Sequence, residues 1–335
     1  MGRIGFFIKR LARIDVKRFR KTFAELRQIT GKNPVFLALD LLVCGIRYNA
    51  GYMDYKIARM DRLNAAQRGT VITRGISNNI VRRMNDKAYW HFFDDKCQFN
   101  GLFREWVQRE WLRSGSSLTL GELTAFCSGK GPLFIKPLEG SSGVGVERAE
   151  PADFEDIPAF FKRLREKGDC IVEETVIQHE AMARLYPGSV NTVRIATLLG
   201  DQGEGIVYAF VRIGNGRVMD NIDAGGMAAR VDLESGVINS VAADKQGHEY
   251  ARHPLTGEAI TGFQLPYFEE AKAMCLKTMR VVPQVRFVAW DVALTPEGPR
   301  LIEGNSFPSH AVPQFAAHYP DGIGILPEFR RFITL

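Results

Sequence analysis

Short apolar runs bounded by glycine, proline and aspartate dominate the chain from Gly131 onward. Runs of this length predict strands, because helices of a globular protein show longer stretches with apolar residues three and four positions apart. The expected strands are 133–135, 170–173, 193–199, 206–211, 228–231, 285–294 and 300–303. Two longer stretches with helical spacing, 152–167 and 267–281, interrupt them. The second part of the chain is therefore expected to be α+β.

Helical patterns dominate before residue 115, for example at 80–84 and 88–93. The longest apolar run, 35–46, includes Asp40 and falls short of the roughly 20 residues that cross a bilayer, so we expect a buried helix there. The predicted organisation is a mainly helical region at 1–115, one α+β lobe at 116–190 and a second α+β lobe at 191–335.

The basic residues are concentrated in the helical region. Residues 1–115 carry 23 Lys/Arg and 10 Asp/Glu, whereas the rest of the chain carries 21 and 28. Such a region suits a membrane surface, a nucleic acid, a phosphorylated substrate or simply solvated helix faces. Within 3–28, apolar residues recur near helical spacing among the cations, which suits peripheral contact with anionic lipid. We expect no nucleic-acid partner, because one would not explain the motifs of the second part.

Cysteine usage suggests a reducing compartment. The five cysteines are widely spaced and never form a CxxC pair, so neither a disulfide framework nor a zinc site is implied. We expect a cytoplasmic protein.

A lysine and a glycine loop form the first chemical motif. Lys136 ends an apolar run, and Pro137 blocks a regular continuation of that strand. The loop at 140–145 has three glycines and two serines, whose small side chains let backbone N–H groups reach phosphate oxygens. It is not a Walker A loop, since no Gly-Lys-Ser/Thr follows. Such a loop is also typical of an ordinary hairpin turn.

Carboxylates form the remaining motifs. Glu173 and Glu174 end a predicted strand where an adenine edge could bind, and Glu180 follows as a candidate for the ribose or as a solvated side chain.

Asp291 lies within a predicted strand, and Glu303 and Asn305 lie two apart on the next strand, so they share a face. Oxygen ligands of this kind suit Mg²⁺ on nucleotide phosphates rather than zinc. The alternative is an acidic pair held by Arg286 or Arg300.

In this order the motifs resemble the ATP-grasp superfamily. The resemblance rests on Asp95-Lys96, 134–137 with the glycine loop, 172–174, Asp291 and 303–305, and it covers roughly residues 90 to 315. Segments 178–179, 189–194, 220–226 and 298–305 resemble its sugar-transfer-associated group. The resemblance implies an ATP-grasp fold, in which two α+β lobes with antiparallel sheets clamp ATP, preceded here by the helical basic region.

The resemblance also implies roles for individual residues. Those expected to bind ATP are Lys96, Lys136, Gly140, Ser141, Ser142, Gly143, Gly145, Glu173, Glu174, Val176 and Glu180. Those expected to bind Mg²⁺ are Asp291, Glu303 and Asn305. Those expected on the acceptor side are Asn191, Arg194, Arg212, Asn221, Gly225 and His310, although His310 could equally cap a helix. The implied catalytic residues are Lys136, Arg194 and Arg212.

The implied activity is that of a carboxylate–amine ligase using ATP and Mg²⁺. A substrate carboxylate is phosphorylated to an acylphosphate, and an amine then displaces phosphate. The substrates would be small carboxylates and amines on a glycan, cell-envelope or secondary-metabolite precursor, and an acidic or phosphorylated acceptor fits the basic region. One departure concerns the arginine that peptide-type ligases often place two residues before the metal aspartate. Ala289 stands there, and Arg212 or Arg230 could substitute. A kinase acting on a hydroxyl therefore stays open.

Overall fold

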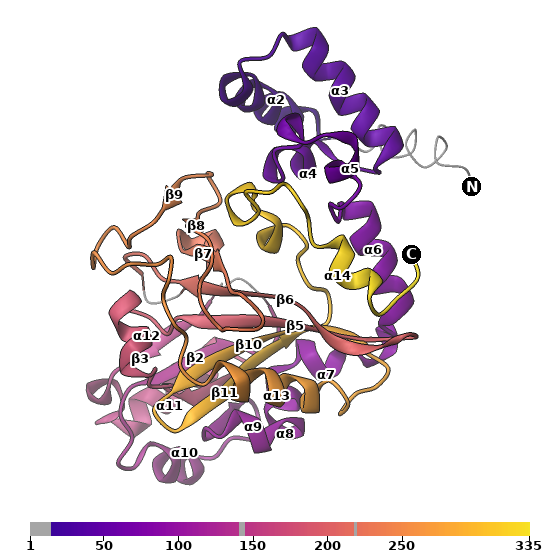
Figure 1. The fold of residues 1–335 in the computed structure, drawn as a ribbon. Coiled ribbons are helices and arrows are strands. Elements are labelled where there is room, and N and C mark those ends of the chain that lie inside the picture. Colours follow the sequence, from indigo (N-terminus) through magenta and orange to yellow (C-terminus); the bar gives the residue numbers. More distant parts are fainter. Residues whose placement is uncertain (1–14, 141–144, 218–219) are drawn as a thin grey trace.

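The computed structural model describes residues 15–140, 145–217 and 220–335 and contains two antiparallel sheets (Figure 1). The smaller sheet has the strand order β1-β4-β2-β3, with bounds β1 (Trp111–Ser114), β2 (Leu133–Pro137), β3 (Glu147–Ala149) and β4 (Cys170–Glu174). The larger sheet has the order β11-β10-β5-β6-β7-β8-β9. Its strands are β5 (Thr192–Gly200), β6 (Gly203–Ile213), β7 (Met227–Arg230), β8 (Ala242–Ala243), β9 (Glu249–Tyr250), β10 (Phe287–Thr295) and β11 (Gly298–Asn305).

Helices flank both sheets and form a separate unit near the N-terminus. The α-helices are α2 (Val16–Thr30), α3 (Pro34–Arg47), α4 (Tyr52–Ile57), α5 (Ala65–Arg68), α6 (Arg74–Met84), α7 (His91–Asp94), α8 (Lys96–Leu102), α9 (Arg104–Val107), α10 (Leu120–Cys127), α11 (Ile157–Lys167), α12 (Glu180–Leu185), α13 (Phe268–Thr278) and α14 (Leu326–Arg330). The short 3₁₀ turns are η1 (Met60–Arg62), η2 (Lys87–Tyr89), η3 (Pro151–Phe154), η4 (Ile222–Ala224), η5 (Val312–Gln314) and η6 (Ala316–His318).

All seven predicted strands are confirmed, as β2, β4, β5, β6, β7, β10 and β11. The two predicted helices correspond to η3 with α11 and to α13. Strands β1, β3, β8 and β9 were not predicted, because two to four residues carry too little periodicity. β1 lies inside the region expected to be mainly helical, yet it pairs with β4 and belongs to the smaller sheet.

Alternation in the smaller sheet decides which side chains reach the cleft. Leu133 and Ile135 of β2 point toward α10 and α11, where they join the same buried cluster as Val172 of β4. Because successive side chains of a strand point to opposite faces, Lys136 and Glu173 are left on the other face. That face looks toward the larger sheet, and both residues line the cavity between the sheets.

The larger sheet is covered on both faces. One face packs on α13 and on α7–α9, with Trp290 at its centre, 5.4 Å from Phe103 between ring centroids. On the other face, Ala196 and Phe210 pack against α6 and α14. Toward the far ends of the same strands, this second face carries Arg194 and Arg212 in place of apolar residues. One sheet face is thus half core and half cleft.

Helices α2–α5 form a unit that projects from the sheets, hereafter the helical unit (Figure 1). Asp15 caps α2 through the backbone N–H of Arg18, and Gly31 ends the helix at a φ of +64°. The helix predicted at 35–46 is confirmed as α3, but the expectation that it is buried is wrong. Only Leu37, Cys44 and Gly45 of α3 are buried.

Candidate active site

A cavity of about 1630 Å³ lies between the two sheets. Its walls come from the cleft faces of both sheets, and residues of α4 and η1 close one end. Of the residues expected in a nucleotide site, Lys96, Lys136, Gly140, Glu173, Glu174, Val176, Glu303 and Asn305 are wall residues. Residues as far apart in the sequence as Lys96 and Asn305 therefore meet in one space, as the resemblance implies.

The wall formed by the smaller sheet centres on Glu173. Its carboxylate is almost completely buried and accepts from Lys136 Nζ and from Arg109 Nε, each at 2.9 Å, while Asn100 Nδ2 donates to the second oxygen at 3.2 Å. Burial by itself would raise the pKa of Glu173, but the two cations outweigh it and lower the pKa to about 2. Glu173 was expected to line the adenine. Its carboxylate accepts from Lys136, the lysine expected to bind phosphate.

Arg109 joins the two lobes and was not predicted. Besides the bond to Glu173, its guanidinium donates to the carbonyl oxygens of Leu301 at 2.7 Å and Ile302 at 3.1 Å, both on β11. One buried side chain therefore ties the smaller sheet to the strand that carries Glu303. No pattern in the sequence marks Arg109, since it lies between two short elements with no motif around it.

Lys96 stands beside Lys136 at the mouth of the glycine loop. Its Nζ donates to the carbonyl oxygens of Leu138 at 3.3 Å and Gly140 at 3.2 Å. Burial lowers the pKa of Lys96, and the nearby charge of Lys136 adds to this effect. Two neighbouring cations with a single carboxylate between them form a site that favours an anion. We call Lys96, Lys136, Arg109 and Glu173 the cationic wall.

The glycine loop is described only at its ends. Gly140 has a φ of +119° and Gly145 a φ of +75°, values that glycine tolerates best. A Cβ on Gly145 would meet Pro137 Cγ at 2.9 Å, so the loop returns close to the strand end it left. Ser141, Ser142 and Gly143 lie outside the described residues.

The wall formed by the larger sheet centres on Asp291, whose carboxylate is fully buried. Arg194 donates to both oxygens, from Nε at 2.5 Å and from Nη2 at 2.6 Å, and Arg212 Nη2 lies 2.8 Å from Oδ2. Burial would raise the pKa of Asp291, but these guanidinium groups hold it below its ordinary range. Asp291 was expected to bind metal. In this structure it binds two arginines instead.

The two arginines reach Asp291 from the neighbouring strands β5 and β6, whereas position 289 carries alanine. Ala289 pairs with Ala196 of β5, whereas Arg194 lies directly opposite Asp291 on that strand. Arg212 reaches in from β6 and also donates to Thr192 Oγ1 at 3.0 Å. Arg230, the other candidate substitute, lies with its guanidinium 4.3 Å from the Tyr319 ring centroid and is not a wall residue of the described cavity.

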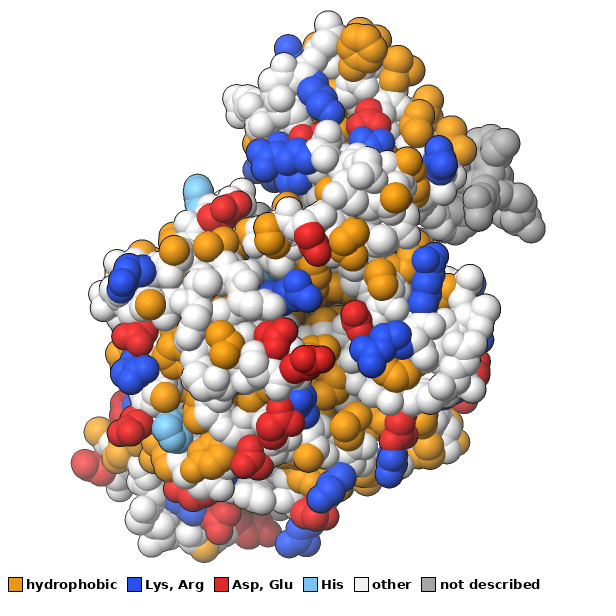
Figure 2. Space-filling model, in the orientation of Figure 1, with side chains coloured by type: hydrophobic (Ala, Val, Ile, Leu, Met, Phe, Trp, Pro, Cys, Tyr) orange, Lys and Arg blue, Asp and Glu red, His pale blue; other side chains and the backbone are white. Residues whose placement is uncertain are grey.

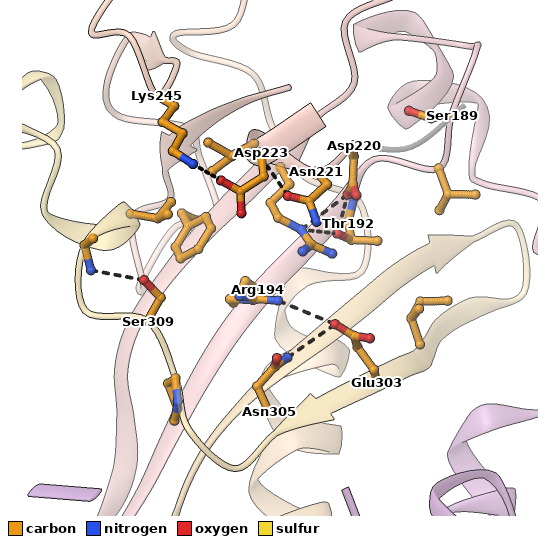
Figure 3. A pocket seen from close by; sticks show the side chains of 18 of the residues that line it. Ser189, Thr192, Arg194, Asp220, Asn221, Asp223, Lys245, Glu303, Asn305 and Ser309 are labelled. Carbon is orange, nitrogen blue, oxygen red and sulfur yellow. Dashed lines mark hydrogen bonds and ion pairs between the residues drawn. The ribbon is translucent and has the colours of Figure 1, made fainter. Parts of the chain in front are cut away.

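Glu303 and Asn305 project into the cavity from β11 (Figure 3). Glu303 is the register partner of Asp291, and Asn305 Nδ2 lies 3.5 Å from Glu303 Oε1. Burial and the negative charge of Asp291 raise the pKa of Glu303. Arg194 Nη2 is 3.7 Å from Glu303 Oε1. We call Asp291, Glu303, Asn305, Arg194 and Arg212 the acidic wall.

The acidic wall fits a Mg²⁺ ion held jointly with phosphates. Among the described residues, no cluster of three or more acidic, histidine or cysteine side chains could form an all-protein metal site. Mg²⁺ commonly takes one or two protein ligands and completes its shell with water and substrate phosphates. The oxygens of Glu303 and Asn305 suit that mode. The carboxyl groups of Asp291 and Glu303 are in contact, and this favours a bound cation in place of a proton shared between them. Of the three expected ligands, Glu303 and Asn305 are the two that line the cavity.

The other residues expected to bind the nucleotide differ in whether they line the cavity. Val176 lines the cavity. Glu174 also lines it, but its carboxylate accepts from the N–H of Glu110 at 2.8 Å and from Lys130 Nζ at 2.6 Å. Glu180 begins α12 as an exposed residue and is not a wall residue of the described cavity. The ribose role expected of Glu180 is therefore not supported.

The residues expected on the acceptor side also differ in whether they line the cavity. Asn191 is fully buried, where its amide donates to Met182 O and Tyr186 O at 2.8 Å and its Oδ1 accepts from the N–H of Gly214. Its hydrogen bonds connect α12 to the larger sheet, and its side chain does not face the cavity. Asn221 lines the cavity and caps η4, whereas Gly225 ends that turn at a φ of +98° without lining the cavity.

His310 lines the cavity at the end closed by the helical unit. Its Nε2 lies 2.8 Å from Asp54 Oδ1 of α4, so it joins the loop after β11 to the helical unit. The alternative that His310 caps a helix is not what the structure shows. His179 does cap one, since its Nδ1 accepts from the N–H of Ala181 at the start of α12.

Comparison with known proteins identifies a family. A family model described as sugar-transfer associated ATP-grasp matches residues 157–326. No curated protein matches the chain.

Among solved structures, the ATP-grasp ligase PsnB with its minimal precursor is similar at 12% identity and a TM-score of 0.43, covering 73% of this chain and 63% of that one. D-alanyl-alanine synthetase A from Vibrio cholerae is similar at 13% identity and a TM-score of 0.44, covering 72% of this chain and 63% of that one. D-cycloserine synthetase DcsG is similar at 12% identity and a TM-score of 0.44, covering 77% of this chain and 76% of that one. The chain spans less than two thirds of the length of the first two proteins.

Proposed function

The chain belongs to the sugar-transfer-associated ATP-grasp family, and from this we propose that it is an ATP-dependent ligase. It activates a substrate carboxylate as an acylphosphate and joins it to an amine. The observation that carries the proposal is the pairing of the cationic wall on the smaller sheet with Glu303 and Asn305 on the larger one, across a single cavity. A polyphosphate with its metal needs both kinds of charge at once.

The first half-reaction depends on the two walls. Lys96 and Lys136 would bind the terminal phosphates, with Lys136 oriented by its bond to Glu173. Mg²⁺, held by Glu303 and Asn305, would offset the negative charge on the phosphate oxygens when bound. The carboxylate oxygen of the substrate attacks the γ-phosphorus, the bond to the β-phosphate oxygen breaks, and ADP leaves. The chain acts mainly by positioning and by fixed charge.

The second half-reaction would use Arg194 and Arg212. The amine nitrogen attacks the acyl carbon, a proton is lost, and phosphate leaves with its bonding electron pair. A guanidinium near the acyl oxygen stabilises the charge that builds there. Both arginines line the cavity and are held by Asp291, so they are fixed in orientation before a substrate binds.

The acceptor would be anionic or carry phosphate. The end of the cavity closed by the helical unit is lined by Arg18, Lys56, Arg59, Arg62 and Arg74. Lys56 is paired with Glu25, and Arg59 with Asp61, whereas Arg62 and Arg74 form no ion pair with any described residue. A cleft lined by one sign of charge attracts the opposite sign. Together with the family description, this supports a charged sugar or glycan precursor.

The decisive experiment supplies Mg·ATP, a panel of carboxylates and hydroxylamine. Hydroxylamine traps an acylphosphate, so a ligase gives a hydroxamate together with ADP for at least one carboxylate. A kinase gives ADP and a stable phosphorylated alcohol, and that product would refute the ligase in favour of the alternative left open by Ala289. Hydroxamate formed only with the carboxylates that carry an additional phosphate or carboxylate group would also support the basic acceptor end.

A further inference from the structure

Helix α3 exposes an uninterrupted apolar face, hereafter the α3 face. Every exposed position between residues 35 and 46 is apolar, and the exposed fractions reach 65% for Val35 and 71% for Phe36. The residues of the face are Val35, Phe36, Ala38, Leu39, Leu42, Val43 and Ile46. They recur three and four positions apart, so they form one broad stripe along the helix. In Figure 2 hydrophobic side chains gather along the outer edge of the helical unit, over α3.

The opposite side of α3 is firmly packed. Leu37 and Cys44 join Leu26 and Tyr55 in the buried cluster of the helical unit. Asp40 accepts from both terminal nitrogens of Arg68 at 2.6 and 2.8 Å and from the Tyr55 hydroxyl at 2.7 Å. These contacts fix which side of the helix faces out. An apolar stripe of this size on a fixed surface is typical of a binding surface.

The charges around the α3 face are positive. Lys32 precedes α3 and Arg47 ends it, so cations stand at both ends of the stripe. The preceding helix, α2, exposes further cations that do not line the cavity and form no ion pair with any described residue: Lys17, Arg20, Lys21 and Arg27. The described acids of the unit are largely engaged: Glu25 pairs with Lys56, Asp40 with Arg68, Asp61 with Arg59 and Asp54 with His310. The charge left over is therefore cationic.

We propose that the α3 face is a membrane-docking surface that lies in the interface of a bilayer containing anionic lipid. The apolar side chains would enter the boundary of the acyl chains, and the surrounding cations would bind lipid phosphates and carboxylates. Apolar burial and a basic patch are the two signals that reversible membrane binding needs. A second copy of the chain fits less well, because two copies joined through α3 would bring two unpaired cationic sets together.

The length of α3 favours lying in the interface over crossing it. No single described helix is long and apolar enough to span a membrane, while α2 and α3, bent by 114° relative to each other, satisfy length and composition as a pair. The 14 residues of α3 extend about 21 Å, against roughly 30 Å of hydrocarbon. Lipid contact was expected within 3–28, of which residues 3–14 lie outside the described part. The proposal moves the apolar contact to α3.

Docking would also orient the enzyme. Helix α4 packs against α3 and lines the cavity through Met53 and Ile57. The end of the cavity with the unpaired Arg62 and Arg74 would then lie close to the lipid surface. The docking proposal stands whether or not the ligase activity is found, because none of its residues takes part in the chemistry.

Co-sedimentation of the full-length chain with phosphatidylcholine–phosphatidylserine vesicles tests the proposal. The wild type should sediment with the vesicles, and Phe36→Ser with Leu39→Ser should lower the partition constant at least about tenfold. Leu255→Ser is the matched control, because Leu255 is 63% exposed on a loop away from α3, and it should change the constant by less than about twofold. Unchanged thermal unfolding of both variants would show that the loss is not misfolding.

Charge variants complete the test. Lys17→Gln with Lys21→Gln should weaken binding to the mixed vesicles about tenfold and have little effect with pure phosphatidylcholine. Failure of the wild type to bind the mixed vesicles would overturn the proposal. So would equal binding by the Phe36/Leu39 variant. Wild-type dimers that this variant abolishes, in the absence of vesicle binding, would assign the face to a second copy instead.

Discussion

The two walls of the cavity each bury one carboxylate between two cations, yet they leave opposite charges at the surface of the cleft. In the cationic wall, Glu173 neutralises only one of Arg109 and Lys136, and Lys96 adds a further positive charge. In the acidic wall, Arg194 and Arg212 are shared among Asp291, Glu303 and the buried Asp220, which lies 3.5 Å from Arg212 Nε. The first wall favours phosphate and the second favours a cation.

This difference explains how similar networks serve different ends. A buried carboxylate held by two cations is a rigid support, and its own negative charge is neutralised by those cations. What each wall offers to a ligand is decided by the side chain beside the support, a lysine on one sheet and Glu303 with Asn305 on the other. Substituting the supporting residues should therefore affect stability, and substituting the neighbours should affect binding.

The largest expected effect comes from Glu303→Gln. This removes the carboxylate of the acidic wall that is held least closely by an arginine, with Arg194 Nη2 3.7 Å away. We expect Mg²⁺-dependent turnover of ATP to fall about a thousandfold, with unfolding free energy changed by less than about 1 kcal/mol. Asp291 keeps its contacts with Arg194 and Arg212 in this variant, so no buried charge is left unpaired. ADP release and urea unfolding measure the two quantities. Glu297→Gln, on the turn between the same strands, is the control, and retained turnover in Glu303→Gln would contradict the metal assignment.

The next effect concerns the support of the cationic wall and depends on pH. Because the pKa of Glu173 is lowered from 4.5 to about 2 in the fold, its contribution of about 3 kcal/mol is fully present above pH 4.5 and is lost as the pH falls toward 2. Glu173→Gln should therefore be much less stable than the wild type at pH 7, and the gap should narrow below pH 4.5. Urea unfolding at several pH values measures it, and a gap independent of pH would contradict the paired state of Glu173.

The smallest effect is expected from Lys136→Met. It removes one phosphate contact from the cationic wall, so affinity for an ATP analogue should fall about ten- to a hundredfold, or roughly 1.4 to 2.7 kcal/mol. Lys130→Met is closely matched, since Lys130 is also paired with glutamates and its side chain is 20% exposed against 21% for Lys136, but it does not line the cavity. Equal affinities of the two variants in an equilibrium binding assay would refute the phosphate role.

Seven of the described strands could be predicted because each has its own local pattern. The runs that became β2, β4, β5, β10 and β11 are apolar over enough residues to be found without neighbours. The spacing of Glu303 and Asn305 likewise predicts that they share a face, since that depends only on the pleat of one strand. The glycine loop and Lys136 were found for the same reason.

The partners of the charged residues could not be predicted. Asp291 was expected to bind metal or to pair with Arg286 or Arg300, but the register of β5 and β6 brings Arg194 and Arg212 onto it. Asn191 was expected at the acceptor side, but its position behind α12 buries it. Arg109 carries no motif and still joins both lobes. Each of these outcomes depends on contacts between segments that are far apart in the chain.

The sequence by itself determined most of the strands, which side chains have the chemistry to bind phosphate or metal, and where the basic charge is concentrated. These properties follow from local periodicity and side-chain chemistry. The tertiary structure alone decided which carboxylates are already neutralised and which face of α3 is left without a partner. Burial and ion pairing depend on which residues pack together in the fold. The apolar pattern of a run such as 35–46 is the same whether other parts of the protein bury that run or leave it exposed.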